Sequence, residues 1–215
     1  AIPIVHGAVM VPVLLVLALA VSLLLPGEFF IVLAGYFVVT LAYSFGLKRL
    51  LMADVIVLAG LYTVRIIAGA AAVSIVPSFW LLAFSMFLFL SLAIVKRYSE
   101  LMVMQAAGKK KAENRSYHSV DLQALLSLGS ASGYISVLVF ALFINSRPIR
   151  NEYATPEVLW LACPLLLYWI SRIWILTRRG DMHDDPVIFT MQDRASLLTM
   201  VLIGAIFSFA SYYTY

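Results

Sequence analysis

Residues 80–101 read WLLAFSMFLFLSLAIVKRYSEL, an uncharged and largely apolar run that ends at Val95 and is followed at once by Lys96, Arg97 and Glu100. Such a run approaches the roughly 20 apolar residues that a helix needs to cross the hydrocarbon core of a bilayer. The charges come where that helix would meet water. Two interpretations stay open: a basic anchor at the membrane surface, or a site that binds phosphate groups.

Further apolar runs recur along the whole chain. The residues A, V, I, L, M, F, W, Y and C make up 63% of the 215 residues, and D, E, K and R only 12%. The alternation of barrel strands is absent, so the spans should be helices. The sequence predicts a single domain, residues 1–215, with an all-α fold: a polytopic membrane helix bundle of about seven transmembrane helices. The predicted spans lie near residues 8–25, 29–46, 54–73, 78–95, 123–145, 157–176 and 195–213.

Most cations follow the second, fourth and sixth predicted spans, and the other side carries only Arg147 and Arg150. The positive-inside rule then places the basic side in the cytoplasm, the N-terminus inside and the C-terminus outside. We expect a multi-pass protein of the cell (inner) membrane, and we read the net charge of +4 as a sign of topology and not of nucleic-acid binding. The cations are Lys48, Arg49, Lys96, Arg97, Lys109, Lys110, Lys111, Arg115, Arg178, Arg179 and Arg194.

Most carboxylates share this basic side. Positive-inside sorting explains cations but says little about carboxylates. The crowding of both signs therefore predicts a polar site whose active face is cytoplasmic. The carboxylates are Asp54, Glu100, Glu113, Asp121, Asp181, Asp184, Asp185 and Asp193.

Arg65 lies in the middle of the third predicted span. Counted from Asp54, it is roughly 16 Å inside the membrane at a rise of about 1.5 Å per residue. An arginine there costs at least about 2.5 kcal/mol on insertion scales, so it needs a partner or a polar cavity. The partner could be carbonyl groups of neighbouring helices or an anionic ligand. Gly69 and residues 70–72 would allow a close helix approach beside it.

Other residues of the basic side are candidates for phosphate contacts or, in the case of the cations, for membrane anchoring. Arginine suits bidentate contact with phosphate, and lysine acts as a point charge. The candidates are Tyr43, Lys48, Arg49, Arg115 and Tyr117.

A group of carboxylates precedes the last predicted span. Asp181, Asp184 and Asp185 are weak candidates for Mg²⁺ ligands, because hard cations take oxygen ligands. Asp193 instead fits a cap at the start of a helix.

Four short motifs occur on the basic side in an order that is similar to a known family. They are Tyr43-Ser44-x-x-Leu47-Lys48-Arg49, Arg65-x-x-Ala68-Gly69, Lys96-Arg97-Tyr98-x-Glu100-Leu101, and Asp185-Pro186 followed by Asp193-Arg194. The chain resembles the UbiA superfamily of intramembrane prenyltransferases. The resemblance is closest to its polyprenyl-phosphate (decaprenyl-phosphate) phosphoribosyltransferase branch and to relatives with a fused phosphatase domain.

The resemblance implies nine transmembrane helices around a cavity, with two polar loops that hold a diphosphate through Mg²⁺. The first loop carries an Asn-Asp-x-x-Asp motif, which this sequence lacks. The seven predicted spans would match the last seven helices. We therefore expect a C-terminal portion whose main metal ligands lie upstream of Ala1.

The second family loop usually carries Asp-x-x-x-Asp, and Lys96–Glu100 takes its place here. A phosphoribosyltransferase must hold phosphoribosyl pyrophosphate and a lipid phosphate together, so the added cations favour that branch. The expected reaction transfers 5-phosphoribose to a polyprenyl phosphate, with Mg²⁺ as cofactor. The expected catalytic residues are Lys96, Arg97 and Glu100, and the expected phosphate-binding residues are Tyr43, Lys48, Arg49, Arg65, Arg115 and Tyr117.

Two alternatives stay open. One is prenyl transfer from a prenyl diphosphate to a small aromatic or other acceptor. The other is a transporter or a non-catalytic membrane scaffold. Transporters commonly contain inverted repeats. No convincing repeat is evident in the sequence, and the concentration of charge on one face argues against a path through the protein.

Overall fold

The computed structural model of the chain describes residues 4–108, 116–182 and 185–212, and this part contains helices and no strand. The all-α prediction is confirmed. The long helices are α1 (Ile4–Ser22), α2 (Gly27–Phe45), α3 (Ala53–Ala72), α4 (Phe79–Ala106), α5 (Leu122–Ile144), α7 (Ala162–Arg179) and α9 (Arg194–Tyr212). The short ones are α6 (Arg147–Glu152), α8 (Pro186–Gln192) and the 3₁₀ turns η1 (Leu47–Arg49), η2 (Ser119–Asp121) and η3 (Pro156–Leu161).

Six helices of the described part are long and apolar enough to cross a membrane. They correspond to the last six predicted spans, while the first predicted span falls in α1, whose described apolar stretch Met10–Ser22 is shorter. Large apolar side chains are exposed along α1, α2 and α9. Such a surface fits lipid, where apolar side chains have no need to be covered. The chain is an integral, multi-pass membrane protein.

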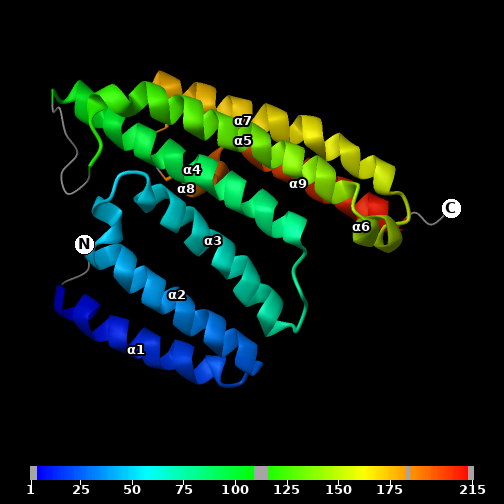
Figure 1. The fold of residues 1–215 in the computed structure, drawn as a ribbon, viewed down its shortest axis with the longest axis horizontal. Helices are drawn as coiled ribbons and strands as arrows, with labels where there is room; N and C mark the ends of the chain where they lie inside the picture. Colours follow the sequence, from blue (N-terminus) through cyan, green and yellow to red (C-terminus); the bar gives the residue numbers. More distant parts are fainter. Residues whose placement is uncertain (1–3, 109–115, 183–184, 213–215) are drawn as a thin grey trace.

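Helices that follow one another in the sequence pack as neighbours in space (Figure 1). The order of contact is α2, α3, α4, α5, α7 and α9, and α8 packs against α4 and α9. α4 is the central helix, with extensive contacts to α3 and α5. One end of the bundle, at the left of Figure 1, gathers the ends of α2, α4 and α7 with the starts of α3 and α5. We call it the basic end, because Lys48, Arg49, Lys96, Arg178 and Arg179 lie there.

α4 is longer than the sequence predicted. Its 28 residues span about 42 Å at 1.5 Å per residue, which exceeds the roughly 30 Å of the hydrocarbon core. The predicted span stopped at Val95, but the helix continues to Ala106. Lys96, Arg97 and Glu100 therefore lie within a helix and not at its end. Lysine, arginine and glutamate are good helix formers, so a change from apolar to charged residues did not mark a helix end.

Two glycines of α5 bring α4, α5 and α7 into close contact. A Cβ atom added at Gly129 would lie 2.2 Å from the ring of Trp174, and one at Gly133 would lie 2.6 Å from Ile170. Ser91 Oγ donates to the Gly129 carbonyl oxygen at 2.7 Å and accepts from Trp174 Nε1 at 3.0 Å. At Gly69, by contrast, the expected close approach is not seen, because an added Cβ would meet no atom of the described residues within 4 Å. Sequence alone did not distinguish a glycine that faces another helix from one that does not.

Substituting Gly129 by alanine should destabilise the bundle by about 1–3 kcal/mol, since overpacking a tight core displaces its neighbours. Here the neighbour is the rigid, buried indole of Trp174. Thermal unfolding in detergent measures the loss. Gly204→Ala in α9 is the matched control, because its Cβ would meet no atom within 4 Å in the part of the chain that the structure describes. Equal melting temperatures for both variants would contradict the packing described here.

Candidate functional site

Helical geometry separates Lys96 from Arg97, although the two are adjacent in the sequence. Successive residues of a helix point about 100° apart at 3.6 residues per turn. The Arg97 side chain is 1% exposed, whereas that of Lys96 is 40% exposed. The two cations therefore belong to two different polar groups. Arg97 is part of an inner cluster with Asp54, Tyr117 and Glu100. Arg97, Asp54 and Tyr117 are buried, whereas the Glu100 side chain is 42% exposed. Lys96 lies at a small pocket beside α8.

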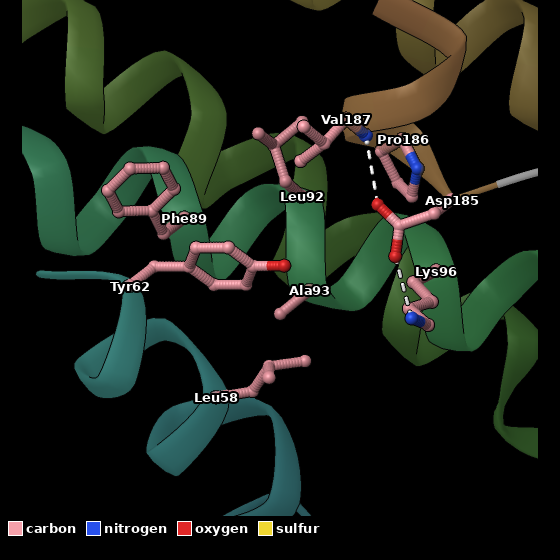
Figure 2. A pocket seen from close by; sticks show the side chains of 9 residues that line it. All are labelled: Leu58, Tyr62, Phe89, Leu92, Ala93, Lys96, Asp185, Pro186 and Val187. Atoms are coloured by element: carbon pink, nitrogen blue, oxygen red, sulfur yellow. Dashed lines mark hydrogen bonds and ion pairs between the residues drawn. The ribbon is translucent and has the colours of Figure 1, made fainter. Parts of the chain in front are cut away.

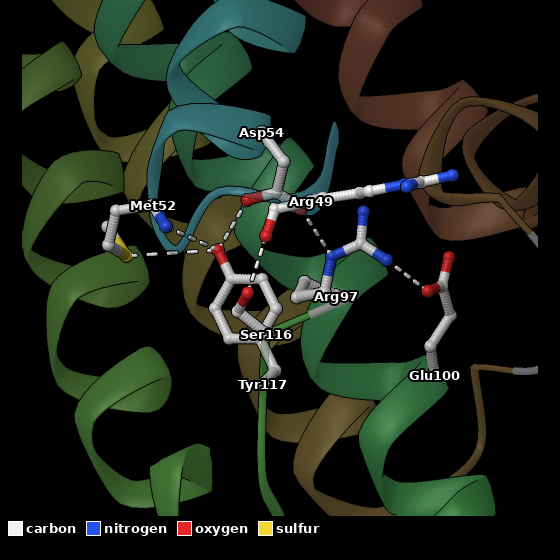
Figure 3. A network of polar contacts seen from close by, with 7 residues as sticks. All are labelled: Arg49, Met52, Asp54, Arg97, Glu100, Ser116 and Tyr117. Carbon is white, nitrogen blue, oxygen red and sulfur yellow. Dashed lines mark hydrogen bonds and ion pairs between the residues drawn. The ribbon is translucent and has the colours of Figure 1, made fainter. Parts of the chain in front are cut away.

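The inner cluster joins α3, α4 and the segment before η2 (Figure 3). Asp54, at the start of α3, is fully buried, and its Oδ2 lies 3.0 Å from Arg97 Nε. Tyr117 donates from its hydroxyl to Asp54 Oδ1 at 2.5 Å. Arg97 also forms an ion pair with Glu100. A carboxylate in the first turn is favoured by the helix dipole, which adds to the effect of the ion pair.

Tyr117 closes the inner cluster. Its hydroxyl accepts from the Met52 amide at 3.1 Å, and Arg97 Cζ lies 5.7 Å from the centre of its ring. Burial, together with the hydrogen bond to Asp54, raises the pKa of Tyr117 well above its usual range. The phenol therefore stays a neutral donor at physiological pH. Through its ion pair with Asp54, Arg97 links α4 to the start of α3.

Lys96 lines a mouth pocket, which we define by Leu58, Tyr62, Phe89, Leu92, Ala93, Lys96, Asp185, Pro186 and Val187 (Figure 2). Lys96 Nζ lies 2.6 Å from Asp185 Oδ2. Asp185 Oδ1 accepts from the Val187 amide at 3.0 Å and so caps α8. The Tyr62 hydroxyl points across the pocket toward this ion pair (Figure 2). The free space is about 20 Å³, close to the size of one water molecule.

Asp185 is ionised in this pocket. Burial raises the pKa of its carboxyl group, but the hydrogen bonds from Lys96 and the Val187 amide outweigh it and hold the pKa below its usual value. The mouth pocket thus contains one cation that is fully compensated by one carboxylate.

An apolar chamber of about 560 Å³ adjoins the mouth pocket, with which it shares Phe89, Leu92 and Val187. It extends along α4 as far as Leu81, about 22 Å from Lys96 at 1.5 Å per residue. The other walls come from α5, α7, α8 and α9. Its remaining lining residues are Phe84, Leu88, Phe140, Phe143, Leu166, Trp169, Thr190, Met191, Met200, Ile203 and Phe207.

Arg65 has the partner that its depth in the membrane requires. Its guanidinium donates to the Tyr36 hydroxyl of α2 at 2.8 Å and lies 4.8 Å from the centre of the Tyr62 ring. Tyr62 in turn stacks on Phe89 with ring centres 5.2 Å apart. Leu58, Tyr62 and Arg65 share one face of α3 by their spacing. Arg65 is exposed, and Tyr62 lies between it and the mouth pocket.

The other predicted phosphate contacts are spread over the basic end. Lys48 is half-buried and Arg49 is exposed on η1, and the Arg49 carbonyl oxygen accepts from Ser116 Oγ beside the inner cluster. Tyr43 is half-buried near the end of α2. Arg115 and Asp184 lie outside the described residues. The structure thus places Tyr117 beside Arg97. The other described residues of the predicted site are divided among the inner cluster, the mouth pocket and the surface.

Three carboxylates at the basic end each face a cation. Asp54 pairs with Arg97, Asp185 with Lys96, and Asp193 with Arg172 at 2.6 and 2.9 Å. Asp181 is exposed. Within residues 4–108, 116–182 and 185–212, no three His, Cys, Asp or Glu side chains gather as a metal site. The carboxylates of the described part do not fit a Mg²⁺ site by themselves, and Mg²⁺ binding stays a prediction.

Asp193 caps α9, as the sequence predicted. Its Oδ2 accepts from the Ser196 amide at 2.7 Å. Burial raises the pKa of this carboxyl group, but hydrogen bonds from Arg172 and Ser196 outweigh it and hold the pKa below the usual value.

Asp193→Asn should therefore lower the free energy of unfolding by about 1–2 kcal/mol at neutral pH, since asparagine keeps the cap but not the charged hydrogen bonds. Because the pKa of Asp193 is lower in the folded protein than in the unfolded chain, its ionised form stabilises the fold. This stabilisation is complete above the unfolded-state pKa of about 3.9 and is lost as the pH falls through the lower folded-state pKa. Unfolding midpoints of both proteins between pH 3 and pH 7 test this. A difference that stays constant across that range would contradict the ion pair's role.

Two residues of the site were missed by sequence reasoning. Asp54 was noted only as one carboxylate of the basic side, although it is the partner of Arg97. Its position at the start of an apolar span was a signal, because a carboxylate there needs a cation. Tyr62 had no distinctive signal beyond its spacing of three residues from Arg65.

Comparison with known proteins gives three informative relatives. The chain is 35% identical over 210 residues to an uncharacterised protein, y4nM, of Sinorhizobium fredii, covering 97% of this chain and 41% of that protein. It is 31% identical over 180 residues to the nodulation protein NoeC of Azorhizobium caulinodans (83% and 59%). It is 30% identical over 199 residues to the decaprenyl-phosphate phosphoribosyltransferase of Mycolicibacterium smegmatis (90% and 62%).

These relatives confirm the UbiA-like relationship. The matches run along most of this chain, and a second organism, Mycobacterium tuberculosis, has a similar phosphoribosyltransferase at 28% identity. The chain spans 41 to 62% of the length of the relatives named above. No family model matches it. The UbiA-like relationship agrees with the observed bundle of apolar helices and with its polar groups at one end.

Proposed function

We propose that the chain is part of a membrane transferase that uses a polyprenyl phosphate, and that its lipid substrate binds at the mouth pocket and the apolar chamber. One observation carries this proposal: a cation, Lys96, lines a small pocket that adjoins an apolar chamber of about 560 Å³. A phosphorylated lipid has the same division into an anionic head and an apolar chain. The relatives named as decaprenyl-phosphate phosphoribosyltransferases support this class of substrate.

The proposed reaction is transfer of 5-phosphoribose from phosphoribosyl pyrophosphate. A phosphate oxygen of the lipid attacks the anomeric carbon of ribose, the bond from that carbon to pyrophosphate breaks, and pyrophosphate leaves with its electron pair. Both substrates are anionic, so holding them together in the right orientation is the main contribution that the protein can make. Lys96 would hold the lipid phosphate by a charge-assisted contact.

Other residues have supporting roles in this proposal. Lys48 and Arg49, on the surface of the basic end, would attract the water-soluble donor. Arg65 would hold Tyr62 in place beside the mouth pocket through its contacts with Tyr36 and Tyr62. Arg97, Glu100 and Tyr117 act as positioning residues, because the inner cluster fixes α3 against α4.

Mg²⁺ dependence and a cytoplasmic active face are part of the proposal as well. The carboxylates Asp54, Asp185 and Asp193 of the described part are paired with cations, so none of them is assigned as a Mg²⁺ ligand. The roles given above therefore do not involve the metal. Titrating activity of the complete protein with Mg²⁺ after chelation tests the dependence.

The function is tested by incubating the complete purified protein with labelled phosphoribosyl pyrophosphate and polyprenyl phosphate in lipid nanodiscs. Label should enter the lipid fraction, and pyrophosphate should be released in equal amount. Parallel reactions contain a labelled prenyl diphosphate and a small aromatic acceptor. Label that enters product only in those parallel reactions would overturn phosphoribosyl transfer and favour prenyl transfer.

A further inference from the structure

Lys96 is already occupied by a protein carboxylate. Its Nζ lies 2.6 Å from Asp185 Oδ2, and the free space beside the pair is about 20 Å³. The Lys96 side chain is 40% exposed, but the space inside the pocket is too small for a head group, so an anion gains the close position at Nζ within the pocket only by displacing Asp185. The carboxylate is therefore a built-in competitor of any ligand at this position.

The surrounding membrane makes such competition important. Ordinary phospholipids are present in great excess over any polyprenyl phosphate and carry a phosphodiester with one negative charge. The choline cation of phosphatidylcholine neutralises that charge, whereas an anionic lipid such as phosphatidylglycerol leaves it uncompensated. A phosphomonoester carries about −1.5 to −2 charges at pH 7. Exchange of the Asp185 carboxylate for a phosphodiester replaces one negative charge by another, with no net Coulomb gain. Exchange for a phosphomonoester gains up to about twice the attraction to Lys96 at the same distance.

We propose that Asp185 is the specificity-determining residue of the lipid site, where its competition for Lys96 favours phosphomonoester lipids over the anionic phosphodiester lipids of the surrounding membrane. This inference rests on the proposed function. Specificity of this kind comes from a cost imposed on the wrong ligand and not only from attraction to the right one.

The position of Asp185 in the fold supports this role. Asp185 Oδ1 caps α8 through the Val187 amide, so its carboxylate is held at the edge of the mouth pocket. The same helix contributes Val187, Thr190 and Met191 to the apolar chamber. The competitor thus lies between Lys96 and the start of the helix that also lines the chamber (Figure 2).

The chain offers a matched control in Asp193. Both carboxylates cap a helix and pair with a cation, but Asp193 pairs with Arg172, away from the mouth pocket. Asparagine is a good cap, so either substitution by asparagine keeps its helix start and removes only the charge.

The test measures polyprenyl phosphate binding to the complete protein in nanodiscs of phosphatidylcholine and in nanodiscs with equal parts of phosphatidylglycerol. Wild type and Asp193→Asn should show dissociation constants that agree within about twofold in the two membranes. Asp185→Asn should bind at least about tenfold more weakly when phosphatidylglycerol is present, a shift of 1.4 kcal/mol.

The outcomes separate this inference from the proposed function. Equal behaviour of Asp185→Asn and wild type in both membranes would overturn the inference alone. An equally large effect of phosphatidylglycerol on Asp193→Asn would overturn it too, because the effect would then not belong to the mouth pocket. If wild type fails to bind polyprenyl phosphate in either membrane, the proposed function falls and the inference falls with it.

Discussion

Replacing Lys96 by methionine should lower transferase activity about 100-fold or more, because loss of one preorganised group that stabilises reacting charge typically costs that much. Methionine keeps much of the apolar stem of lysine and removes the charge. The Lys96 side chain is 40% exposed and its partner Asp185 is 23% exposed, so the bundle itself should stay folded. Steady-state transfer of labelled phosphoribose and the melting temperature in detergent are the two measurements.

The control for this variant is Arg178→Met, which removes a cation from an exposed position at the end of α7. It should leave activity near that of wild type. If the Lys96 variant has the activity of wild type, Lys96 does not bind the lipid substrate and its assignment is wrong. A large fall in its melting temperature would mean that Lys96 is needed for the fold and would contradict its assignment to substrate.

Replacing Arg97 by methionine should have a different effect: a loss of about 3–5 kcal/mol in the free energy of unfolding. Asp54 is fully buried and would be left without its cation. Activity should fall in proportion to the loss of folded protein. The stability of the variant is measured by unfolding it in a series of detergent mixtures and monitoring the loss of helix by circular dichroism.

A second substitution tests the reason for that loss. Changing Asp54 to leucine in the Arg97→Met background removes the unpaired charge and should recover much of the stability, as replacement of buried ion pairs by apolar groups often does. Wild type, Arg97→Met, Asp54→Leu and the double variant form a double-mutant cycle. We expect it to give a coupling energy between the two residues of more than about 1 kcal/mol. An Arg97→Met protein as stable as wild type but inactive would instead place Arg97 in direct contact with phosphate.

The helical spans were predictable because length and apolar content largely decide which segments cross a membrane. Each of the seven predicted spans overlaps a helix of the structure, and six of these helices are long and apolar enough to cross a membrane within the described residues. The cap at Asp193 was predictable for a similar reason, since capping depends on residues close in the sequence. The end of α4 was not, because charged residues can continue a helix beyond the membrane.

The arrangement of the polar groups was harder to predict from sequence. Lys96 and Arg97 formed one expected site, but the direction of each side chain depends on the neighbours of α4. Arg97 faces Asp54, which lies 43 positions earlier in the chain, and Lys96 faces Asp185, which lies 89 positions later. Contacts at such separations follow from helix packing. The same holds for Gly129, whose role depends on Trp174 of another helix.

The most direct measurement uses a polyprenyl phosphate with a photoactivatable diazirine in its chain, bound to the complete protein in nanodiscs and cross-linked by light. Peptide mass spectrometry identifies the labelled residues. The account predicts labels on chamber residues such as Leu88, Met200 and Ile203, which unlabelled polyprenyl phosphate suppresses and uncharged polyprenol does not. Specific labelling confined to α1 and α2, with the chamber unlabelled, would contradict the proposed lipid site.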